Sequence, residues 1–197
     1  MLKVVGGKHR GRSIATPEGS TTRPTSNRAR ESLFNILMHA HWNDADRHGG
    51  TSPLVDARVL DAFAGSGALG IEALSRGAAH ATFLDKDAAA VKAIGENVAK
   101  LGETTAAKVV RADVLRPPPL RDPAREACDL VFLDPPYRSG DAAPALAALA
   151  EAGWVKAGAI ATVEIASTED LIPPPGFETI DERRYGKAKI VILRRTP

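Results

Sequence analysis

The sequence predicts an α/β fold in which a mostly parallel, doubly wound sheet ends in an antiparallel hairpin. Strand-like apolar runs alternate with helical patterns over residues 58–165, and that alternation is typical of parallel sheets with crossover helices. Two motifs follow two of these strands, at the edge where open α/β sheets bind ligands. A length of 197 residues, with 44% hydrophobic and 25% charged residues, suits one globular domain with a sizeable core.

The N-terminal segment is expected to be an extension of this fold. Residues 2–15 predict a β-hairpin with a basic tip at residues 6–11, because short strand-like runs flank a glycine-rich segment. Thr25 or Ser26 can cap a following helix. The apolar residues of that helix repeat at the spacing of one helical face, at Ala29, Leu33, Phe34 and Leu37.

Residues 1–42 are therefore assigned to the extension, residues 43–53 to a polar, glycine-rich linker, and residues 54–197 to the main body. In the body, apolar runs predict strands at 58–63, 80–85, 107–112, 129–133 and 158–165. Helical patterns between them predict helices at 67–76, 87–101 and 141–152. The closing antiparallel hairpin is expected to pair residues 177–185 with residues 189–193.

The turn after the first strand of the body carries the pattern G-x-G-x-x-G at Gly65, Gly67 and Gly70. Glycines let the backbone approach a ligand closely, and the N-terminus of the helix that follows offers free N–H groups to an anion. Asp85 ends the next strand, twenty residues after Gly65, where a carboxylate can accept hydrogen bonds from ribose hydroxyls. The pattern predicts a cofactor that contains a nucleoside.

Asp134-Pro135-Pro136-Tyr137 follows the apolar strand 130–133. Proline cannot donate to a sheet ladder, so the strand ends there and a rigid turn holds one carboxylate and one aromatic ring at its edge. The turn thus places one hydrogen-bond acceptor, Asp134, and one flat ring, Tyr137, over the cleft at that edge.

The two motifs together favour one cofactor over two others. The glycine pattern also allows NAD, but the chain leaves little room for a second domain, and hydride transfer has no use for Asp-Pro-Pro-Tyr. A nucleoside triphosphate is disfavoured because no Gly-Lys-Ser/Thr follows the glycines. The pair of motifs resembles the S-adenosylmethionine-dependent amino-methyltransferases and their Rossmann-like fold. The resemblance implies that S-adenosylmethionine contacts Asp61, Phe63, Ala64, Gly65, Ser66, Gly67, Asp85, Lys86, Asp113 and Val114.

Charge is distributed unevenly along the chain, although the formal net charge is only +2. Residues 1–30 contain seven Lys and Arg residues and a single acid, Glu18. A basic segment on a mildly acidic body predicts a phosphate-binding element. The basic residues that could bind nucleic acid in this way are Lys8, Arg10, Arg12, Arg23, Arg28 and Arg30.

Other classes of function find little support in the sequence. The five histidines form no i, i+4 pair and have no cysteine partners, so no metal site is expected. The single cysteine, Cys128, cannot form an internal disulfide and suits a reducing compartment. Neither a signal peptide nor a membrane-spanning apolar run is expected. We expect a cytoplasmic protein with no membrane partner.

Over nearly its whole length the chain resembles the RsmD family, bacterial methyltransferases of 16S ribosomal RNA. The most specific likeness is the N-terminal signature in residues 11–12, 22–25 and 30–37, and residues 63–78, 134–137 and 184–186 also match. The resemblance implies methylation of a guanine N2 amine, expected at guanine 966, within the small ribosomal subunit or an assembly intermediate. It also implies Asp134, Pro135, Pro136 and Tyr137 as the catalytic residues.

The sequence differs from the family pattern at one position, and other functions remain as alternatives. Asn27 stands where the family usually has Asp, although Asn can still cap a helix. The tetrapeptide or a near variant also serves N6-adenine methyltransferases of DNA or RNA and protein glutamine methyltransferases. A non-enzymatic RNA-binding protein on the same fold is a further alternative, against which the intact glycines, Asp85 and Asp134 argue.

Overall fold

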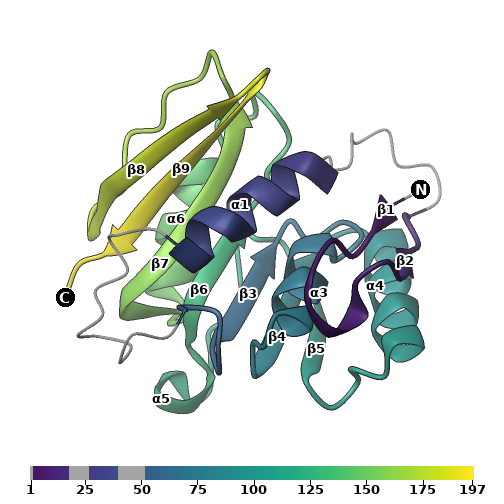
Figure 1. Cartoon of the computed structure of the whole chain (residues 1–197). Coiled ribbons are helices and arrows are strands. Elements are labelled where there is room, and N and C mark those ends of the chain that lie inside the picture. Colours follow the sequence, from purple (N-terminus) through teal and green to yellow (C-terminus); the bar gives the residue numbers. More distant parts are fainter. Residues whose placement is uncertain (1, 18–26, 40–51) are drawn as a thin grey trace.

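The computed structural model describes residues 2–17, 27–39 and 52–197 (Figure 1). In these residues the main sheet has seven strands in the order β5-β4-β3-β6-β7-β9-β8. The first five are parallel, and β9 and β8 are antiparallel to their neighbours. This confirms the predicted doubly wound sheet with a closing hairpin.

The strands of the main sheet are β3 (Arg58–Ala62), β4 (His80–Asp85), β5 (Ala107–Arg111), β6 (Cys128–Leu133), β7 (Val155–Ala166), β8 (Phe177–Tyr185) and β9 (Ala188–Arg195). Its helices are α3 (Ala68–Ser75), α4 (Ala88–Leu101), the short α5 (Pro123–Glu126) and α6 (Ala142–Glu151). The predicted strands and helices agree to within a few residues. Helix α5, where a loop was expected, was missed, because a four-residue helix contains too little periodicity to detect.

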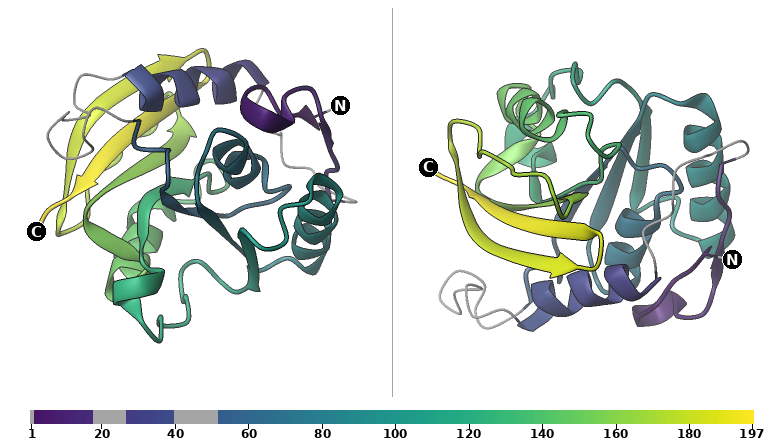
Figure 2. Two further views of the ribbon diagram at one scale, coloured as in Figure 1. Left: turned by 60° about the horizontal axis from the view of Figure 1, so that its bottom comes forward. Right: turned by 90° about the horizontal axis from the view of Figure 1, so that it is seen from above.

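Helices cover both faces of the sheet, as expected when β3, β4 and β6 are linked by crossovers. One buried cluster joins the sheet to α3 and α4, with Phe83 and Ile94 among its members. Another joins the opposite face to α6, where Leu146 and Leu149 are fully buried. Figure 2 shows α1 and α6 on opposite sides of the sheet.

The N-terminal extension packs into the first of these clusters. Strand β1 (Leu2–Lys3) pairs antiparallel with β2 (Ser13–Ile14), and the tip between them contains the 3-10 helix η1 (Gly7–His9), so the predicted hairpin is confirmed. Helix α1 (Asn27–His39) lies across the sheet (Figure 1). Its Phe34 ring meets that of Phe132 on β6, with centroids 5.6 Å apart. The extension therefore shares its core with the body.

The tip of the hairpin is seated on the C-terminal end of α3. The Ser75 hydroxyl donates to the Gly6 carbonyl at 2.6 Å and accepts from the His9 N–H at 2.9 Å. Gly7 has a φ of 73°, and a side chain there would collide with the Ser75 carbonyl. Gly7 thus allows the tip to approach a helix of the same chain closely.

Helix α1 also shows that one predicted RNA contact is wrong. The Arg30 side chain is fully buried, 3.6 Å from the Glu72 carboxylate on α3, and it donates to the Lys3 carbonyl. Arg30 lies three, four and seven positions before Leu33, Phe34 and Leu37, on the apolar stripe of α1. The Arg30 guanidinium pairs with Glu72 between α1 and α3. Because the side chain is fully buried, it is not accessible to RNA in this structure.

Two other predictions fall outside the described residues. They are the helix cap at Thr25 or Ser26 and most of the linker at 43–53. None of the described helices is long and apolar enough to cross a membrane. Among the described residues, no group of three or more His, Cys, Asp or Glu side chains could hold a metal ion.

Candidate active site

The predicted site residues gather at one edge of the sheet because their strands are parallel neighbours. Asp85 is the last residue of β4, and Asp134 directly follows β6. The glycine loop 63–67 follows β3, which lies between β4 and β6. From β3 the chain winds outward through β4 to β5 and then crosses back to β6, so the loop lies at the topological switch point. Such a point is where doubly wound sheets bind nucleotide ligands.

The glycine loop is held in an unusual backbone conformation. Phe63 has a φ of 59°, a left-handed value that is strained for an aromatic residue. The loop is closed by hydrogen bonds from the Ala64 N–H to the Leu84 carbonyl (3.1 Å) and from the Gly67 N–H to the Ala64 carbonyl (2.7 Å). Gly67 is the N-cap of α3, so the helix N-terminus faces this loop. The arrangement can bind an anionic group at that N-terminus.

The third glycine of the motif, Gly70, is required for close packing of α3 on the sheet. It lies in the first turn of α3, and a side chain there would collide with the ring of Phe83 on β4. The absence of a side chain lets α3 pack tightly on the sheet. The Gly70 N–H also donates to Asp61 Oδ2 at 2.8 Å. The third glycine is therefore a packing residue that ties α3 to the end of β3.

Asp61 is a buried acid at this edge of the sheet. Its side chain lies within β3 with 2% exposure. Burial raises the pKa of Asp61 to about 8, the hydrogen bond from Gly70 opposes that rise, and the negative charges of Asp134 and Asp85 add to it. The negative charges of Asp85 and Asp134 thus act on Asp61, and a cation bound beside these residues would stabilise the ionised form of Asp61.

Asp85 organises the glycine loop directly. One carboxylate oxygen accepts from the Gly65 N–H at 2.8 Å, and the other accepts from the Asp87 N–H at 2.9 Å. The structure therefore brings Asp85 and the glycine loop into contact. Asp113 follows β5, and its carboxylate accepts from the Leu115 N–H at 3.1 Å. Of the other predicted cofactor residues, Val114 is buried and Lys86 is exposed.

The Asp-Pro-Pro-Tyr turn presents its aromatic ring to solvent. Asp134 is partly buried, Pro135 is buried and Tyr137 is 47% exposed. The Tyr137 hydroxyl donates to Glu164 Oε1 on β7 at 2.7 Å. The ring is thus tethered at its hydroxyl end while much of its surface stays accessible, as a stacking platform requires.

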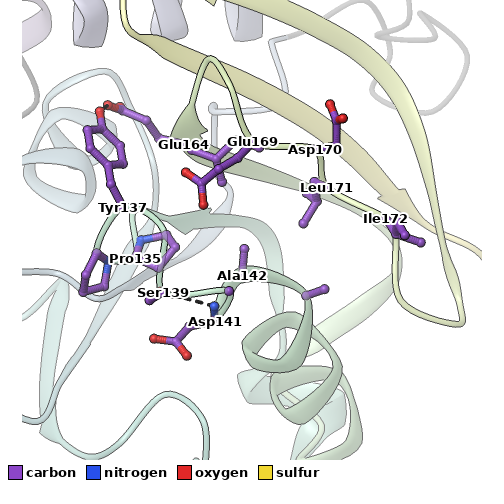
Figure 3. Close-up of a pocket in the computed structure, with 14 residues that line it drawn as sticks. Pro135, Tyr137, Ser139, Asp141, Ala142, Glu164, Glu169, Asp170, Leu171 and Ile172 are labelled. Carbon is purple, nitrogen blue, oxygen red and sulfur yellow. Dashed lines mark hydrogen bonds between the residues drawn. The ribbon is translucent and has the colours of Figure 1, made fainter.

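A second acid fastens this turn to the end of β7. Glu169 accepts from the Arg138 N–H at 3.0 Å and from the Ala166 N–H at 2.8 Å. Beside the turn lies a pocket of about 220 Å³, into which Glu169 points (Figure 3). Its walls include Pro135, Tyr137 and Glu164, but Asp134 and the predicted cofactor residues do not line it. The pocket therefore adjoins the site on the side away from the glycine loop.

Glu164 and Glu169 were not among the predicted site residues. Glu164 lies near the end of the strand predicted at 158–165, and Glu169 lies in the loop that follows. Acids near the C-terminal end of another parallel strand were the signal that could have revealed them.

The predicted RNA-binding residues are only partly brought together. Lys8 pairs with Glu103 at 2.6 Å, and Arg12 donates to the Lys100 carbonyl at 3.2 Å. Arg10 is exposed at the tip of the hairpin. Arg23 and the side chain of Arg28 lie outside the described residues. The tip is therefore a basic surface that is already anchored on α4.

The sheet order, the glycine loop after β3 and the Asp-Pro-Pro-Tyr turn after β6 define an α/β protein with the fold of the S-adenosylmethionine-dependent methyltransferases. A family model described as "Conserved hypothetical protein 95" matches residues 2–194. The chain belongs to this family, the RsmD family.

Comparison with individual proteins agrees with that family. The chain is 36% identical over 196 residues to "Ribosomal RNA small subunit methyltransferase D" of Escherichia coli strain K12, covering 98% of this chain and 90% of the relative. It superposes on the solved Escherichia coli protein yhhF with a TM-score of 0.76 at 33% identity, over 99% of this chain and 98% of that one. A ribosomal protein L11 methylase from Lactobacillus delbrueckii subsp. bulgaricus, at 17% identity and a TM-score of 0.54, shares the fold over 72% of this chain and 70% of its own.

Proposed function

We propose that this protein transfers a methyl group from S-adenosylmethionine to the exocyclic N2 amine of one guanine in 16S ribosomal RNA, with guanine 966 as the expected target. The observation that carries the proposal is the meeting of the glycine loop and Asp134–Tyr137 at neighbouring strand ends. The RsmD membership supports ribosomal RNA as the substrate, because the Escherichia coli relative is named for small-subunit ribosomal RNA. The RNA is taken within the small subunit or an assembly intermediate.

The residues around the glycine loop suit the chemical groups of S-adenosylmethionine. Its ammonium and sulfonium cations match the carboxylates of Asp61, Asp85 and Asp134, because the negative charges of Asp85 and Asp134 already act on Asp61. Its carboxylate matches the N-terminus of α3 after Gly67. When bound, the cofactor supplies an activated methyl group. The residues that would hold it are Asp61, Phe63, Ala64, Gly65, Ser66, Gly67, Asp85, Lys86, Asp113 and Val114.

Asp134 and Pro135 act on the amine that receives the methyl group. Asp134 and the Pro135 carbonyl accept its N–H groups and align the nitrogen for in-line attack. Positive charge develops on that nitrogen during transfer, so the Asp134 carboxylate stabilises the transition state more than the ground state. A carboxylate in a partly buried setting, as Asp134 is, does this more strongly than one in bulk water.

Tyr137 holds the base that carries the amine. A guanine inside a duplex cannot present N2 to the turn, so the target must be unstacked from its neighbours. Stacking on the exposed ring of Tyr137 is worth about 1–3 kcal/mol. Pro135 and Pro136 stiffen the turn, which fixes the position of the Tyr137 ring relative to the Asp134 carboxylate.

The basic tip of the N-terminal hairpin contributes the electrostatic part of RNA binding. Lys8, Arg10 and Arg12 gather there on a rigid base formed by α3 and α4. Arg23 and Arg28 belong to the same proposal, and Arg30 is removed from it because it is buried. Phosphate contacts of this kind position the RNA and leave the choice of base to the site.

The test is transfer of label from S-adenosylmethionine to small ribosomal subunits that lack the modification, with naked DNA and a protein extract as parallel substrates. Nucleoside mass spectrometry of the product should identify N2-methylguanosine at one position of 16S RNA. Methyladenosine or methylcytidine would overturn the choice of guanine N2. Label in glutamine would overturn the choice of RNA, and RNA binding without any transfer would indicate a non-enzymatic protein.

A further inference from the structure

Glu164 lies near the end of β7, in the position next to Asp134 at the end of the neighbouring strand β6. Strands β6 and β7 are parallel, and their last paired residues are Leu133 and Val163. Asp134 and Glu164 are each the next residue along the chain. Asp134 directly follows β6, and Glu164 lies beside it on β7, two residues before that strand ends, so the two carboxylate-bearing residues are neighbours at the same edge of the sheet. This juxtaposition follows from the register and is invisible in the sequence.

The Tyr137 hydrogen bond brings Glu164 to the place where the target base would stack. Its hydroxyl donates to Glu164 Oε1 at 2.7 Å, so the carboxylate lies at the rim of the ring that would support the base (Figure 3). Glu164 is partly buried, which strengthens any charge-assisted hydrogen bond that it makes. Glu169 differs, because both of its oxygens are bonded to backbone N–H groups and its role is to fasten loops.

An ionised carboxylate at this position can bind only the hydrogen-bond donors of a base. It accepts hydrogen bonds and donates none. The Watson–Crick edge of guanine offers the N1–H and the N2 amine, which are neighbouring donors. Adenine and cytosine have an exocyclic amine as well, but the ring nitrogen beside that amine carries a lone pair. A second carboxylate next to Asp134 would attract guanine and repel the other two bases.

We propose that Glu164 is the residue that selects guanine: it accepts the N1–H while Asp134 accepts an N2–H. The inference rests on the proposed function and names the side chain that gives it base selectivity. Asp-Pro-Pro-Tyr alone suits any flat amine, so selectivity needs a residue outside the motif. A site that hydrogen-bonds a polar group of its substrate strongly rejects an analogue that lacks this group, because the hydrogen-bonding groups of the site are then left unpaired. An apolar pocket discriminates much less.

The experiment uses small subunits reconstituted with RNA that carries either guanosine or 2-aminopurine riboside at the target position. 2-Aminopurine keeps the N2 amine but has a lone pair at N1. The wild-type protein should prefer guanosine strongly. In Glu164→Gln the amide can donate to that lone pair, so the ratio of the two kcat/KM values should fall about 10-fold or more, as expected for loss of a hydrogen bond to a charged group.

Two variants and one binding measurement separate this role from others. Tyr137→Phe removes the hydroxyl that donates to Glu164 but keeps the stacking ring, and it should leave the ratio nearly unchanged. Glu178→Gln, at an exposed position on β8, should leave both rates unchanged. Calorimetric affinity of Glu164→Gln for S-adenosylmethionine should equal that of the wild type, which shows that the site is folded.

Two results would overturn the assignment while the proposed function stands. In one, the wild type makes N2-methylguanosine and Glu164→Gln keeps the full preference for guanosine. In the other, Tyr137→Phe lowers the ratio as much as Glu164→Gln, which would mean that Glu164 acts only by positioning the ring. If the wild type makes no N2-methylguanosine at all, the proposed function fails first and the Glu164 assignment fails with it.

Discussion

Arg30 on α1 and Glu72 on α3 form an ion pair at 3.6 Å with both side chains fully buried. Glu72 also accepts from the Val5 N–H at 2.9 Å and from Arg76 Nε at 2.8 Å. The carboxylate thus joins the hairpin, α1 and the helix that follows the glycine loop. Helix α3 is also hydrogen-bonded to the end of β3, through the Gly70 N–H and Asp61. The N-terminal extension is therefore linked through α3 to the candidate cofactor site.

Replacement of Arg30 should destabilise the protein without changing its contacts with RNA. Arg30→Met leaves the buried carboxylate of Glu72 without that partner, and breaking a buried pair in this way costs about 3–5 kcal/mol. The free energy of unfolding in urea measures the loss. Arg10→Met, at an exposed position, is the matched control and should cost little. An unchanged stability for Arg30→Met would contradict the structural role.

The pKa of Asp61 predicts how stability depends on pH. Its folded-state pKa of about 8 lies above its ordinary value of 3.8, so between these values the folded protein holds a proton that the unfolded chain has lost. Stability should therefore fall as pH rises through this range, by up to about 1.4 kcal/mol per pH unit from this group, and level off above it. Urea unfolding from pH 5.5 to 8.5 measures the slope.

Asp61→Asn removes the titrating group and keeps an oxygen that can accept from the Gly70 N–H. The slope over the same pH range should become flatter in this variant than in the wild type. Equal slopes for both proteins would mean that Asp61 is already ionised at neutral pH.

Asp85 should govern affinity for the cofactor. Asp85→Ala removes the acceptor proposed for the ribose and also frees the Gly65 N–H, which it binds at 2.8 Å. Each lost hydrogen bond to a charged acceptor costs about 1.5–3 kcal/mol, which is about tenfold or more in Kd. Calorimetry with S-adenosylmethionine measures the change. Asp113→Ala is the comparison, and a weaker effect of Asp85→Ala than of Asp113→Ala would argue against the ribose assignment.

Asp134 should govern transfer and leave cofactor affinity nearly intact. Asp134→Ala removes the carboxylate that faces the developing charge on the amine nitrogen. Single-turnover transfer to small subunits, with the cofactor saturating, should become undetectable or fall by orders of magnitude. Asp134→Asn keeps the shape and one acceptor, so it should retain more activity than Asp134→Ala. The assignment fails if cofactor affinity collapses while the bound complex still turns over normally.

The basic tip should set the salt dependence of RNA binding. Neutralising Lys8, Arg10 and Arg12 together should lower affinity and flatten the plot of log K against log salt, because each lost phosphate contact removes counterion release. Arg12 also anchors the tip on α4 and Lys8 anchors it on Glu103, just after that helix, so Arg10→Ala alone serves as the variant that leaves the fold untouched. An unaltered salt slope in the triple variant would exclude the tip as the RNA contact.

Local patterns in the sequence were sufficient to predict most of the fold and the motifs at its edge. Residues 130–133 of strand Cys128–Leu133 form a continuous apolar run, and the prolines that follow Asp134 indicate where the strand ends. The glycine loop was recognisable because G-x-G-x-x-G stood between a strand and a helix. Such signals involve residues close together in the chain, where backbone sterics and periodicity act directly.

Arg30 and Glu164 required the tertiary structure. Arg30 shares the apolar stripe of α1, but only the position of Glu72 on α3 makes its burial favourable. Glu164 became part of the site only when β7 was placed beside β6 in parallel register. Sheet order and register are long-range properties, decided by how whole layers of side chains pack, and for that reason the partners of these two charges could not be read from neighbouring residues in the sequence.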